Sequence, residues 1–240
     1  MSYNRIYKKR LNRYGTDYQS RIQNKREENF HQYLQRSTSK VIFEFNGKIE
    51  EGSFERNRQS NTKTLCYLLT DRKLSIPVGT IVMLPDHNKE EKPWMVYWEE
   101  TIQNSGYNKY SILKMTHFLK WEYEDYWHES WAYMYGQEDN MLKDEIRSRS
   151  RSSVIYGENS KLDFFIMPLN PYIKKELYFE VGEKPYTEGY RVTGYDRQST
   201  PGVQFVTVDP VYLYDKSEKP VKKEEDDEDD FFWFNGGGYE

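Results

Sequence analysis

Cysteine and alanine each occur only once in this chain of 240 residues, as Cys66 and Ala132. A single cysteine excludes an intrachain disulfide and any metal site built from several thiolates. Because alanine is the strongest helix former, a chain that nearly lacks it is not expected to be a helical bundle. The mean hydropathy is −1.01, and no segment approaches the ~18 consecutive apolar residues of a membrane span. The composition therefore predicts neither a helical bundle nor a membrane protein.

Aromatic residues are abundant by contrast: they make up 17% of the chain, and 22 of them are tyrosines. Aromatic and β-branched residues favour strands. Short strand patterns recur about every ten residues, with glycine, proline and asparagine between them, which is typical of small barrels and sandwiches. We therefore predict a mainly β protein with two small β-barrel or sandwich modules, an N-terminal partly helical arm and an acidic C-terminal tail.

Changes in composition suggest how the chain is divided. The expected parts are a basic arm at residues 1–39, a first β module at 40–136, a helix and Arg-Ser connector at 137–153, a second β module at 154–215, and the tail at 216–240. The pattern IPVGTIVMLP followed by KPWMVYWEE is similar to ELYFEVG followed by GYRVTGYDR. This similarity leaves an internal duplication open.

The two ends of the chain carry opposite charge. Residues 1–40 contain ten Lys and Arg against three acids, whereas residues 215–240 contain ten acids against four Lys. This polarity suggests head-to-tail contacts between copies or with a partner, and two solvated ends are the alternative. Apolar residues three and four apart predict a helix over residues 18–35, but its apolar face is thin. The arm is therefore expected to pack on another subunit or a partner and not on its own barrels, with these interface residues: Tyr3, Tyr7, Arg10, Arg13 and Tyr14.

The tail combines seven consecutive acids, at residues 224–230, with four aromatics, Phe231, Phe232, Trp233 and Phe234. Four adjacent aromatics in water would favour aggregation, while the acids keep the segment extended by self-repulsion. One interpretation is a flexible strap that delivers an aromatic anchor into a pocket on a neighbouring protein. The alternative is a tail whose aromatics pack on the barrel of the same chain.

Motifs for chemistry are missing from the sequence. There is no glycine-rich nucleotide-binding motif, and no HExxH or HxH spacing. His117, Asp125 and His128 lie close in sequence, but packing or hydrogen bonding is the favoured role for the histidines. Cys66 lies in the apolar run TLCYLL, where a buried inert thiol is expected. The chain is therefore predicted to be non-enzymatic, with no metal and no cofactor.

Two binding functions stay open as alternatives. Arg147, Arg149 and Arg151 alternate with serine and could contact DNA phosphates, although the isoelectric point near 5.8 argues against a dedicated nucleic-acid binder. Five of the six tryptophans lie within residues 94–131. They favour a barrel core with an oligomer interface over a carbohydrate platform. The alternatives are thus a carbohydrate-active or carbohydrate-binding β protein and a cytoplasmic barrel that binds single-stranded nucleic acid.

The segments PVGTIVML, KPWMVYWEE and ILKMTHFLKWEY together resemble the small β-barrel of head-closure and head–tail connector proteins from tailed phages of Gram-positive hosts. In those proteins a G-x-I strand precedes a W-x-V strand, and a later segment ends in L-K-W, here Leu119, Lys120 and Trp121. This chain has Met115 and Thr116-His117 where Cys and Asn are common. The segment LYFEVGEKPYTEGYRVTGYDRQSTPGVQFVTV resembles a second recurring phage pattern.

The resemblance implies a structural protein of the virion neck, assembled in the host cytoplasm and without catalytic activity or cofactor. Such a protein forms a ring of its own copies that closes the DNA-filled head and joins it to the tail. The implied partners are further copies of the chain, the neighbouring portal or adaptor protein, and the tail proteins. Sequence-independent contact with the packaged DNA is also implied.

Overall fold

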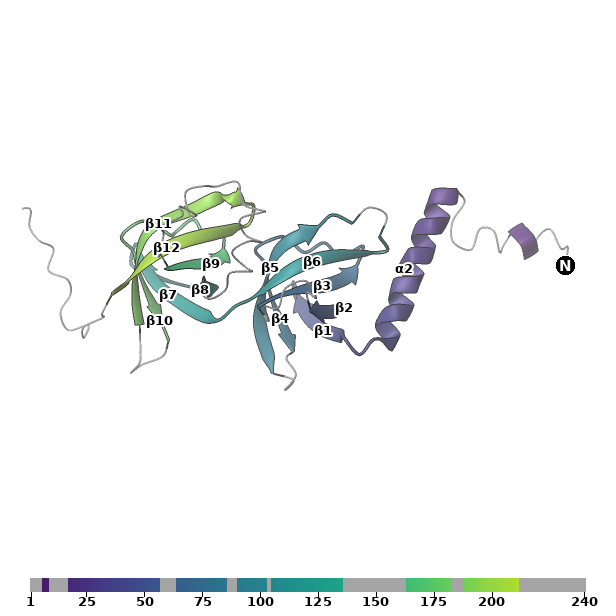
Figure 1. The fold of residues 1–240 in the computed structure, drawn as a ribbon, viewed down its shortest axis with the longest axis horizontal. Helices are drawn as coiled ribbons and strands as arrows, with labels where there is room; N and C mark the ends of the chain where they lie inside the picture. Colours follow the sequence, from purple (N-terminus) through teal and green to yellow (C-terminus); the bar gives the residue numbers. More distant parts are fainter. Residues whose placement is uncertain are drawn as a thin grey trace, which may run out of the picture.

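The protein is described by a computed structural model that covers residues 6–8, 17–56, 64–85, 90–102, 105–135, 163–182 and 188–211. Within these residues, one long helix accompanies twelve strands that form two six-stranded sheets (Figure 1). The two sheets follow each other along the long axis, and the helix lies at one end (Figure 1). The prediction of a mainly β protein with two barrel-like modules is confirmed.

The N-terminal sheet contains the first six strands, and the helix α2 (Tyr18–Arg36) precedes it. All its strand pairs are antiparallel, in the order β1-β2-β3-β6-β5-β4. The outer strands β1 and β4 lie side by side, so the sheet curls into a barrel that is open along this seam. The strands are β1 (Lys40–Phe45), β2 (Lys48–Arg56), β3 (Leu65–Asp71), β4 (Ile81–Pro85), β5 (Glu91–Glu100) and β6 (Tyr107–Lys114).

The C-terminal barrel contains the other six strands and is closed. Its order is β10-β11-β12-β9-β8-β7, and antiparallel pairing of β10 with β7 completes the circle. Closure removes the free strand edges that would otherwise invite pairing with other chains. The strands are β7 (His117–Tyr123), β8 (Tyr126–Tyr135), β9 (Asp163–Pro168), β10 (Tyr178–Val181), β11 (Glu188–Thr200) and β12 (Val203–Val211).

The strand pairing moves the predicted boundary between the two modules. The hairpin β7–β8 was expected to complete the first module, but Tyr133 pairs with Ile166 of β9, and Leu119 pairs with Val181 of β10. The chain therefore passes from one sheet to the other at Met115 and Thr116, and not after residue 136. The helix and Arg-Ser connector predicted at residues 137–153 lie outside the described residues, and in sequence they fall between β8 and β9, which pair with each other. A polar composition indicates where a connection between strands lies, but the backbone hydrogen bonds determine which strands belong to the same sheet.

Both sheets share a single strand order, which supports the internal duplication. If the strands of each sheet are numbered from one to six, both orders read 1-2-3-6-5-4. The similar sequence patterns fall on β4–β5 and on β10–β11, which occupy equivalent positions. Each sheet also has an irregular register between its fifth and sixth strands, after Val96 in the first and after Val192 in the second. A β-bulge of this kind bends a strand and increases its twist.

A shared hydrophobic core joins the two sheets into one body. Met95 and Leu113 from the N-terminal sheet pack with Tyr133, Ile166 and Phe205 from the barrel. All five are at most 6% exposed. Because the core lies between the sheets, neither sheet buries its own apolar surface fully without the other.

Two glycines allow the turns of the two sheets to touch. A Cβ on Gly79 would lie 2.0 Å from the Gly202 carbonyl oxygen, and one on Gly202 would lie 2.1 Å from the Val78 carbonyl oxygen. Both glycines have positive φ, at +89° and +81°. Only a residue without a side chain permits this backbone conformation at this distance. The junction between the sheets therefore depends on glycine at both positions.

Arg197 holds the connection between β9 and β10 in place. Its guanidinium donates hydrogen bonds to the carbonyl oxygens of Asn170, Pro171 and Ile173, and its Nε donates to Oε1 of Gln204 at 3.3 Å. Carbonyl groups in an irregular segment need such donors because no neighbouring strand pairs with them. The arginine thus takes the place of a strand partner for this segment.

Helix α2 begins where the apolar spacing predicts. The Asp17 side chain caps it by accepting a hydrogen bond from the Ser20 amide at 2.8 Å, which also lowers the pKa of Asp17. Its inner face buries Phe30 and Leu34 against Leu69 of β3, with Tyr107 of β6 beside them. The expectation that the arm finds no surface on its own chain is therefore wrong for this helix. Within the described residues, no helix combines the length and apolar composition needed to cross a membrane.

Candidate interaction surface

Helix α2 meets the N-terminal sheet through two parallel rows of side chains. Residues four positions apart lie above one another on a helix. One row is polar and consists of Gln23, Glu27 and His31. The adjacent row runs from Arg26 to Phe30 to Leu34, so it begins with a charge and ends in the buried core. The thin apolar face expected from the sequence is thus sufficient when a polar row supports it.

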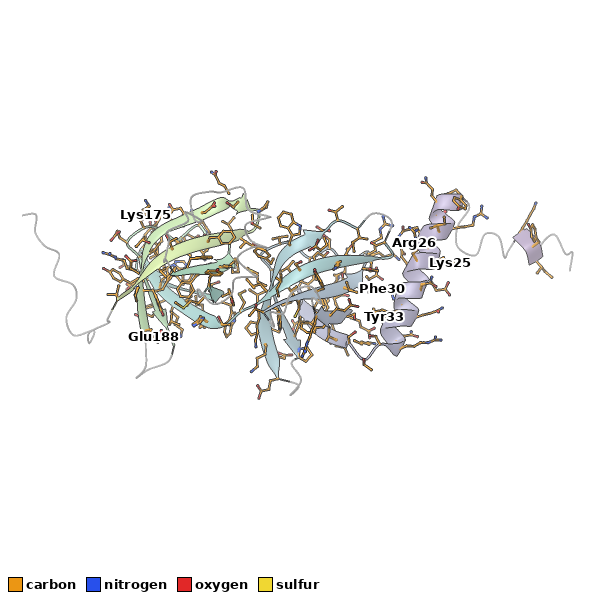
Figure 2. All side chains as sticks on the ribbon, viewed as in Figure 1. Lys25, Arg26, Phe30, Tyr33, Lys175 and Glu188 are labelled. Atoms are coloured by element: carbon orange, nitrogen blue, oxygen red, sulfur yellow. The ribbon has the colours of Figure 1, made fainter. Side chains whose placement is uncertain are left out.

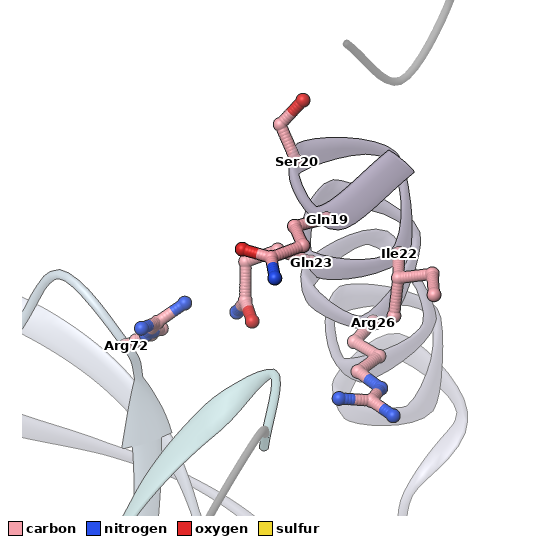
Figure 3. A pocket seen from close by; sticks show the side chains of 6 residues that line it. All are labelled: Gln19, Ser20, Ile22, Gln23, Arg26 and Arg72. Carbon is pink, nitrogen blue, oxygen red and sulfur yellow. The ribbon is translucent and has the colours of Figure 1, made fainter. Parts of the chain in front are cut away.

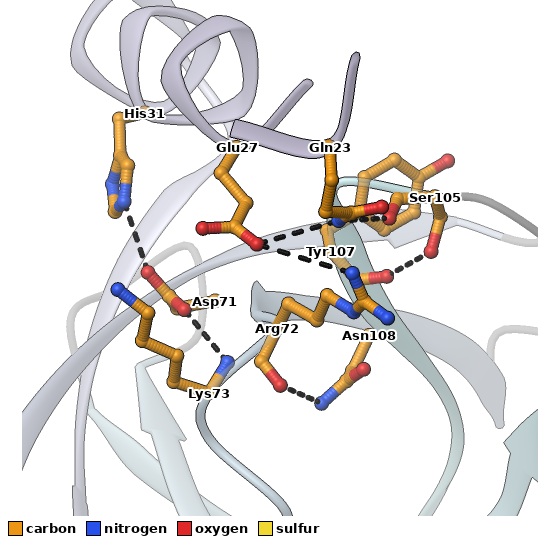
Figure 4. A network of polar contacts seen from close by, with 9 residues as sticks. All are labelled: Gln23, Glu27, His31, Asp71, Arg72, Lys73, Ser105, Tyr107 and Asn108. Atoms are coloured by element: carbon orange, nitrogen blue, oxygen red, sulfur yellow. Dashed lines mark hydrogen bonds and ion pairs between the residues drawn. The ribbon is translucent and has the colours of Figure 1, made fainter. Parts of the chain in front are cut away.

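The polar row contacts two turns of the sheet (Figure 4). His31 Nε2 lies 2.9 Å from Asp71 Oδ2, and Glu27 Oε1 lies 4.0 Å from an Arg72 guanidinium nitrogen. Gln23 Nε2 donates a hydrogen bond to the Ser105 carbonyl oxygen at 3.0 Å. These contacts are exposed or half-buried, so each stabilises the docked helix only modestly. They fix the rotation of the helix, and this rotation places Arg26 and Phe30 of the other row along a groove.

Gly106 brings the helix close to the sheet at this point. A Cβ on Gly106 would lie 2.4 Å from the carbonyl carbon and oxygen of Arg26. The helix backbone therefore lies directly against the turn before β6, and any side chain at position 106 would displace it. Sequence reasoning missed this glycine, since a lone glycine after a serine reads only as a turn.

A largely apolar groove of about 570 Å³ lies between α2 and the sheet, and we call it the α2 groove. Its lining also includes Asn29 and Glu55, and the Glu55 carboxylate accepts a hydrogen bond from the Tyr33 hydroxyl at 2.8 Å. Phe30 and Leu69, each 5% exposed, form its floor together with Tyr107, whose ring centroid is 5.1 Å from that of Phe30. Ile102 and Tyr33 are exposed large side chains that line it. Figure 2 shows Arg26, Phe30 and Tyr33 on α2, at the end of the molecule where the helix lies.

A second space of about 470 Å³ lies beside the groove, and we call it the cationic mouth. Arg26 lines both spaces, and Arg72 lines the mouth from the turn after β3. Figure 3 shows Arg72 on the sheet, across the space from Gln23 on the helix. Glu27 offsets part of the charge of Arg72. The surface therefore changes along its length from a polar, positively charged section to an apolar one.

The residues predicted for partner contact are mostly outside the described part of the chain. This holds for Tyr3, Arg10, Arg13 and Tyr14, for Phe231, Phe232, Trp233 and Phe234, and for Arg147, Arg149 and Arg151. Tyr7 lies in the short helical stretch at residues 6–8 and is 54% exposed. The partner roles of these residues stay predictions. The sequence did not single out Arg26 and Arg72, which the structure places around the same mouth. The four-residue spacing from Gln23 to His31 could have indicated a helix face that packs on the sheet.

His117 and His128, the two histidines near Asp125 in sequence, serve as packing residues in the barrel. The His117 ring packs edge-on against Phe165, and burial lowers the pKa of His117. His128 lies stacked between Trp121 and Tyr172, with ring centroids 5.7 and 4.6 Å away. Among the described residues, no group of three or more His, Cys, Asp or Glu side chains is arranged to hold a metal ion. Cys66 is buried, as predicted.

The tryptophans at residues 94–131 are distributed over several core clusters. Trp94 and Trp121 are buried in two different clusters, and Trp98 and Trp131 pack against the shared core. Trp127 is 57% exposed, next to Tyr126 at the turn between β7 and β8. Most of these residues therefore build the barrels, as favoured from the sequence, whereas Trp127 and its neighbour Tyr126 form an exposed aromatic pair.

Comparisons with known proteins add little to this picture. No protein-family model matches the chain, and no curated protein matches it either. Two solved structures of MrkH align with the chain, at 6% and 7% identity. The first is described as a c-di-GMP-dependent transcription regulatory factor, and the second is a crystal structure of MrkH from K. pneumonia. The alignments cover 80% of this chain and 84% and 85% of those chains, with TM-scores of 0.23 and 0.24. At such TM-scores the likeness supports no conclusion about this chain.

Proposed function

We propose that this protein is a structural subunit of the head–tail connector of a tailed phage. It has no catalytic role in this proposal. Copies of the chain form a ring in the virion neck, close the DNA-filled head and join it to the tail. The proposal begins from the sequence segments that resemble connector proteins, and their positions in the fold support it.

The supporting observation is that the two resembling regions meet at the junction of the two sheets. Gly79, in PVGTIVML, contacts the turn at Gly202, in the second resembling segment. Met115, between β6 and β7, is 3% exposed in the shared core. These residues determine how the two sheets are joined. The resemblance therefore concerns the rigid architecture of the subunit, which is the property that a ring component needs.

Exposed apolar side chains on both sheets also fit a subunit with neighbours. Ile42 and Ile49 on the hairpin β1–β2 are 56% and 79% exposed, and Tyr126 at the tip of β7–β8 is 72% exposed. Single exposed apolar residues are common on monomers. Here they lie on both halves of an elongated molecule, where contacts to neighbours on more than one side would cover them. The portal or adaptor protein and the tail proteins are the proposed neighbours, together with further copies of the chain.

The test is to delete the gene from the phage or prophage that carries it. The expected result is DNA-filled or leaking heads and separate tails, with joining restored when the protein is supplied in trans. A gold-labelled version should mark the neck in electron micrographs. Intact tailed particles from the deletion strain would contradict the proposal. Specific binding to a polysaccharide, lost on replacing Tyr126 and Trp127 with Ala, would instead favour the carbohydrate alternative.

A further inference from the structure

The α2 groove and the cationic mouth form one continuous surface with a definite chemical order. Arg26 lines both, Arg72 lies on the mouth side, and Phe30, Tyr107 and Ile102 lie on the groove side. An extended peptide that fits this surface carries negative charge in one section and large apolar side chains in the next. An acidic peptide followed directly by aromatic residues satisfies both sections, with its acids at the arginines and its aromatics against Phe30 and Tyr107.

The C-terminal tail of the chain itself has this order. Seven acids at residues 224–230 are followed without a gap by Phe231, Phe232, Trp233 and Phe234. We infer that the α2 groove binds the C-terminal tail of a second copy of the chain. The acids lie over the mouth, near Arg26 and Arg72, and the aromatics lie against the apolar floor. The tail is outside the described residues, so the assignment rests on the groove and on the tail's sequence.

The fold favours a second copy over the same chain as the source of the tail. Gly189 of β11 pairs with Val211, at the end of β12, so the chain leaves the barrel next to Glu188. Figure 2 shows Glu188 at the end of the molecule opposite Arg26 and Phe30. The twenty residues from Val211 to Phe231 extend over at most ~66–72 Å, and a flexible chain of this length has a typical span of about 25 Å. To reach its own groove the tail would have to run back along the molecule, whereas a neighbouring copy can place its groove beside the end from which the tail leaves.

A contact of this kind is head-to-tail. Such contacts build closed rings when the rotation between copies closes, and open filaments when it does not. The opposite charges of the two chain ends, noted in the sequence, would favour this encounter. The inference requires only that copies of the chain associate, so it stands or fails independently of the proposed role in a phage connector.

The test uses two full-length variants, each defective in one half of the contact. The first replaces Phe231, Phe232, Trp233 and Phe234 with Ser and keeps the groove. The second keeps the tail and carries Arg26→Glu or, in a separate version, Ile102→Glu. Ile102 is on the surface and 39% exposed, so Ile102→Glu leaves the fold intact even if a change on α2 loosens the helix. Sedimentation velocity measures the assembly state of each variant alone and of their mixture.

The wild type is expected to self-associate, each variant alone to be monomeric, and the mixture to form a one-to-one heterodimer through the single intact tail–groove pair. Lys25→Glu is the matched control, since Lys25 is exposed on the same helix but does not line the groove or the mouth. Binding of a labelled peptide of residues 222–240 to the tail-defective variant should weaken at least tenfold with Arg26→Glu and less than twofold with Lys25→Glu. Added salt should also weaken it, because exposed charges are screened.

Several results would overturn the inference. A monomeric wild type that loses thermal stability when the four aromatics are replaced would place them on their own barrel. If the wild type is monomeric and replacing the four aromatics leaves its thermal stability unchanged, the tail would serve another partner. Association that persists in the tail-defective variant alone would show that copies meet through a different surface. Loss of phage assembly has no bearing on any of these outcomes, which are read on purified protein.

Discussion

Replacing Gly202 with Ala tests whether the two sheets form one unit. The new Cβ would lie 2.1 Å from the Val78 carbonyl oxygen, at a φ of +81°. The positive φ costs an alanine about 1–2 kcal/mol, and forcing an atom into a closely packed junction costs about 1–3 kcal/mol more. The free energy of unfolding should therefore fall by about 2–5 kcal/mol. The backbone must shift, and the shared core around Met95 and Phe205 must shift with it.

Gly47→Ala is the control that separates the two costs. Gly47 also has a positive φ, at +71°, but nothing lies within 4 Å of a Cβ at this position. Its variant should lose only the backbone contribution of about 1–2 kcal/mol. Urea denaturation, followed by tryptophan fluorescence, measures both losses as shifts of the midpoint. If the free energy of unfolding fell by the same amount in both variants, within about 0.5 kcal/mol, the close contact between the sheets would add nothing to stability. The argument that this contact joins the sheets into one body would then fail.

Three further predictions concern the helix, the barrel interior and a loop. Gly106→Val should release α2, because a side chain there meets the Arg26 backbone, and hydrogen exchange should then show lost protection in α2 while both sheets keep theirs. Burial lowers the pKa of His117, so the unfolded chain binds a proton at a higher pH than the folded one. The free energy of unfolding should therefore be highest above the ordinary pKa of 6.5 and fall as the pH drops below it. In His117→Gln, the urea midpoint should change less between pH 8 and pH 5 than in the wild type. Arg197→Leu should cost about 1.5–3 kcal/mol through the lost hydrogen bonds to the loop carbonyls, and equal stability of variant and wild type would contradict the role given to this arginine.

The assignment of α2 to its own sheet changes how the basic arm is understood. The helix was expected to require another subunit, because few of its residues are apolar. In the structure Phe30 and Leu34 suffice, since Gly106 permits close approach and the row from Gln23 to His31 adds polar contacts. The surface left for a partner is then the groove beside the helix, and the helix itself forms part of the receptor.

Local pattern in the sequence determined most of the secondary structure. Alternating apolar and polar residues indicated the strands in both sheets, and the dipeptide Asn46-Gly47 marked the hairpin between β1 and β2, where both residues have positive φ. The spacing of apolar residues placed α2 within one residue of its observed end. These features depend on neighbours within a few positions, so the sequence alone is enough to predict them. The similar patterns that raised an internal duplication likewise fell on equivalent strands.

Only the tertiary structure decided which strands share a sheet and where the two halves meet. The hairpin β7–β8 is adjacent in sequence to β6, yet its hydrogen bonds go to β9 and β10. The contact of Gly79 with Gly202, and the groove formed by Arg26, Phe30 and Tyr107, join residues that are far apart along the chain. Contacts of this kind leave no periodic signal in the sequence of either segment. The alternation of apolar and polar residues that makes a segment a strand is the same whichever other strand it pairs with. The architecture of the candidate site was therefore set by long-range packing, which local sequence pattern does not encode.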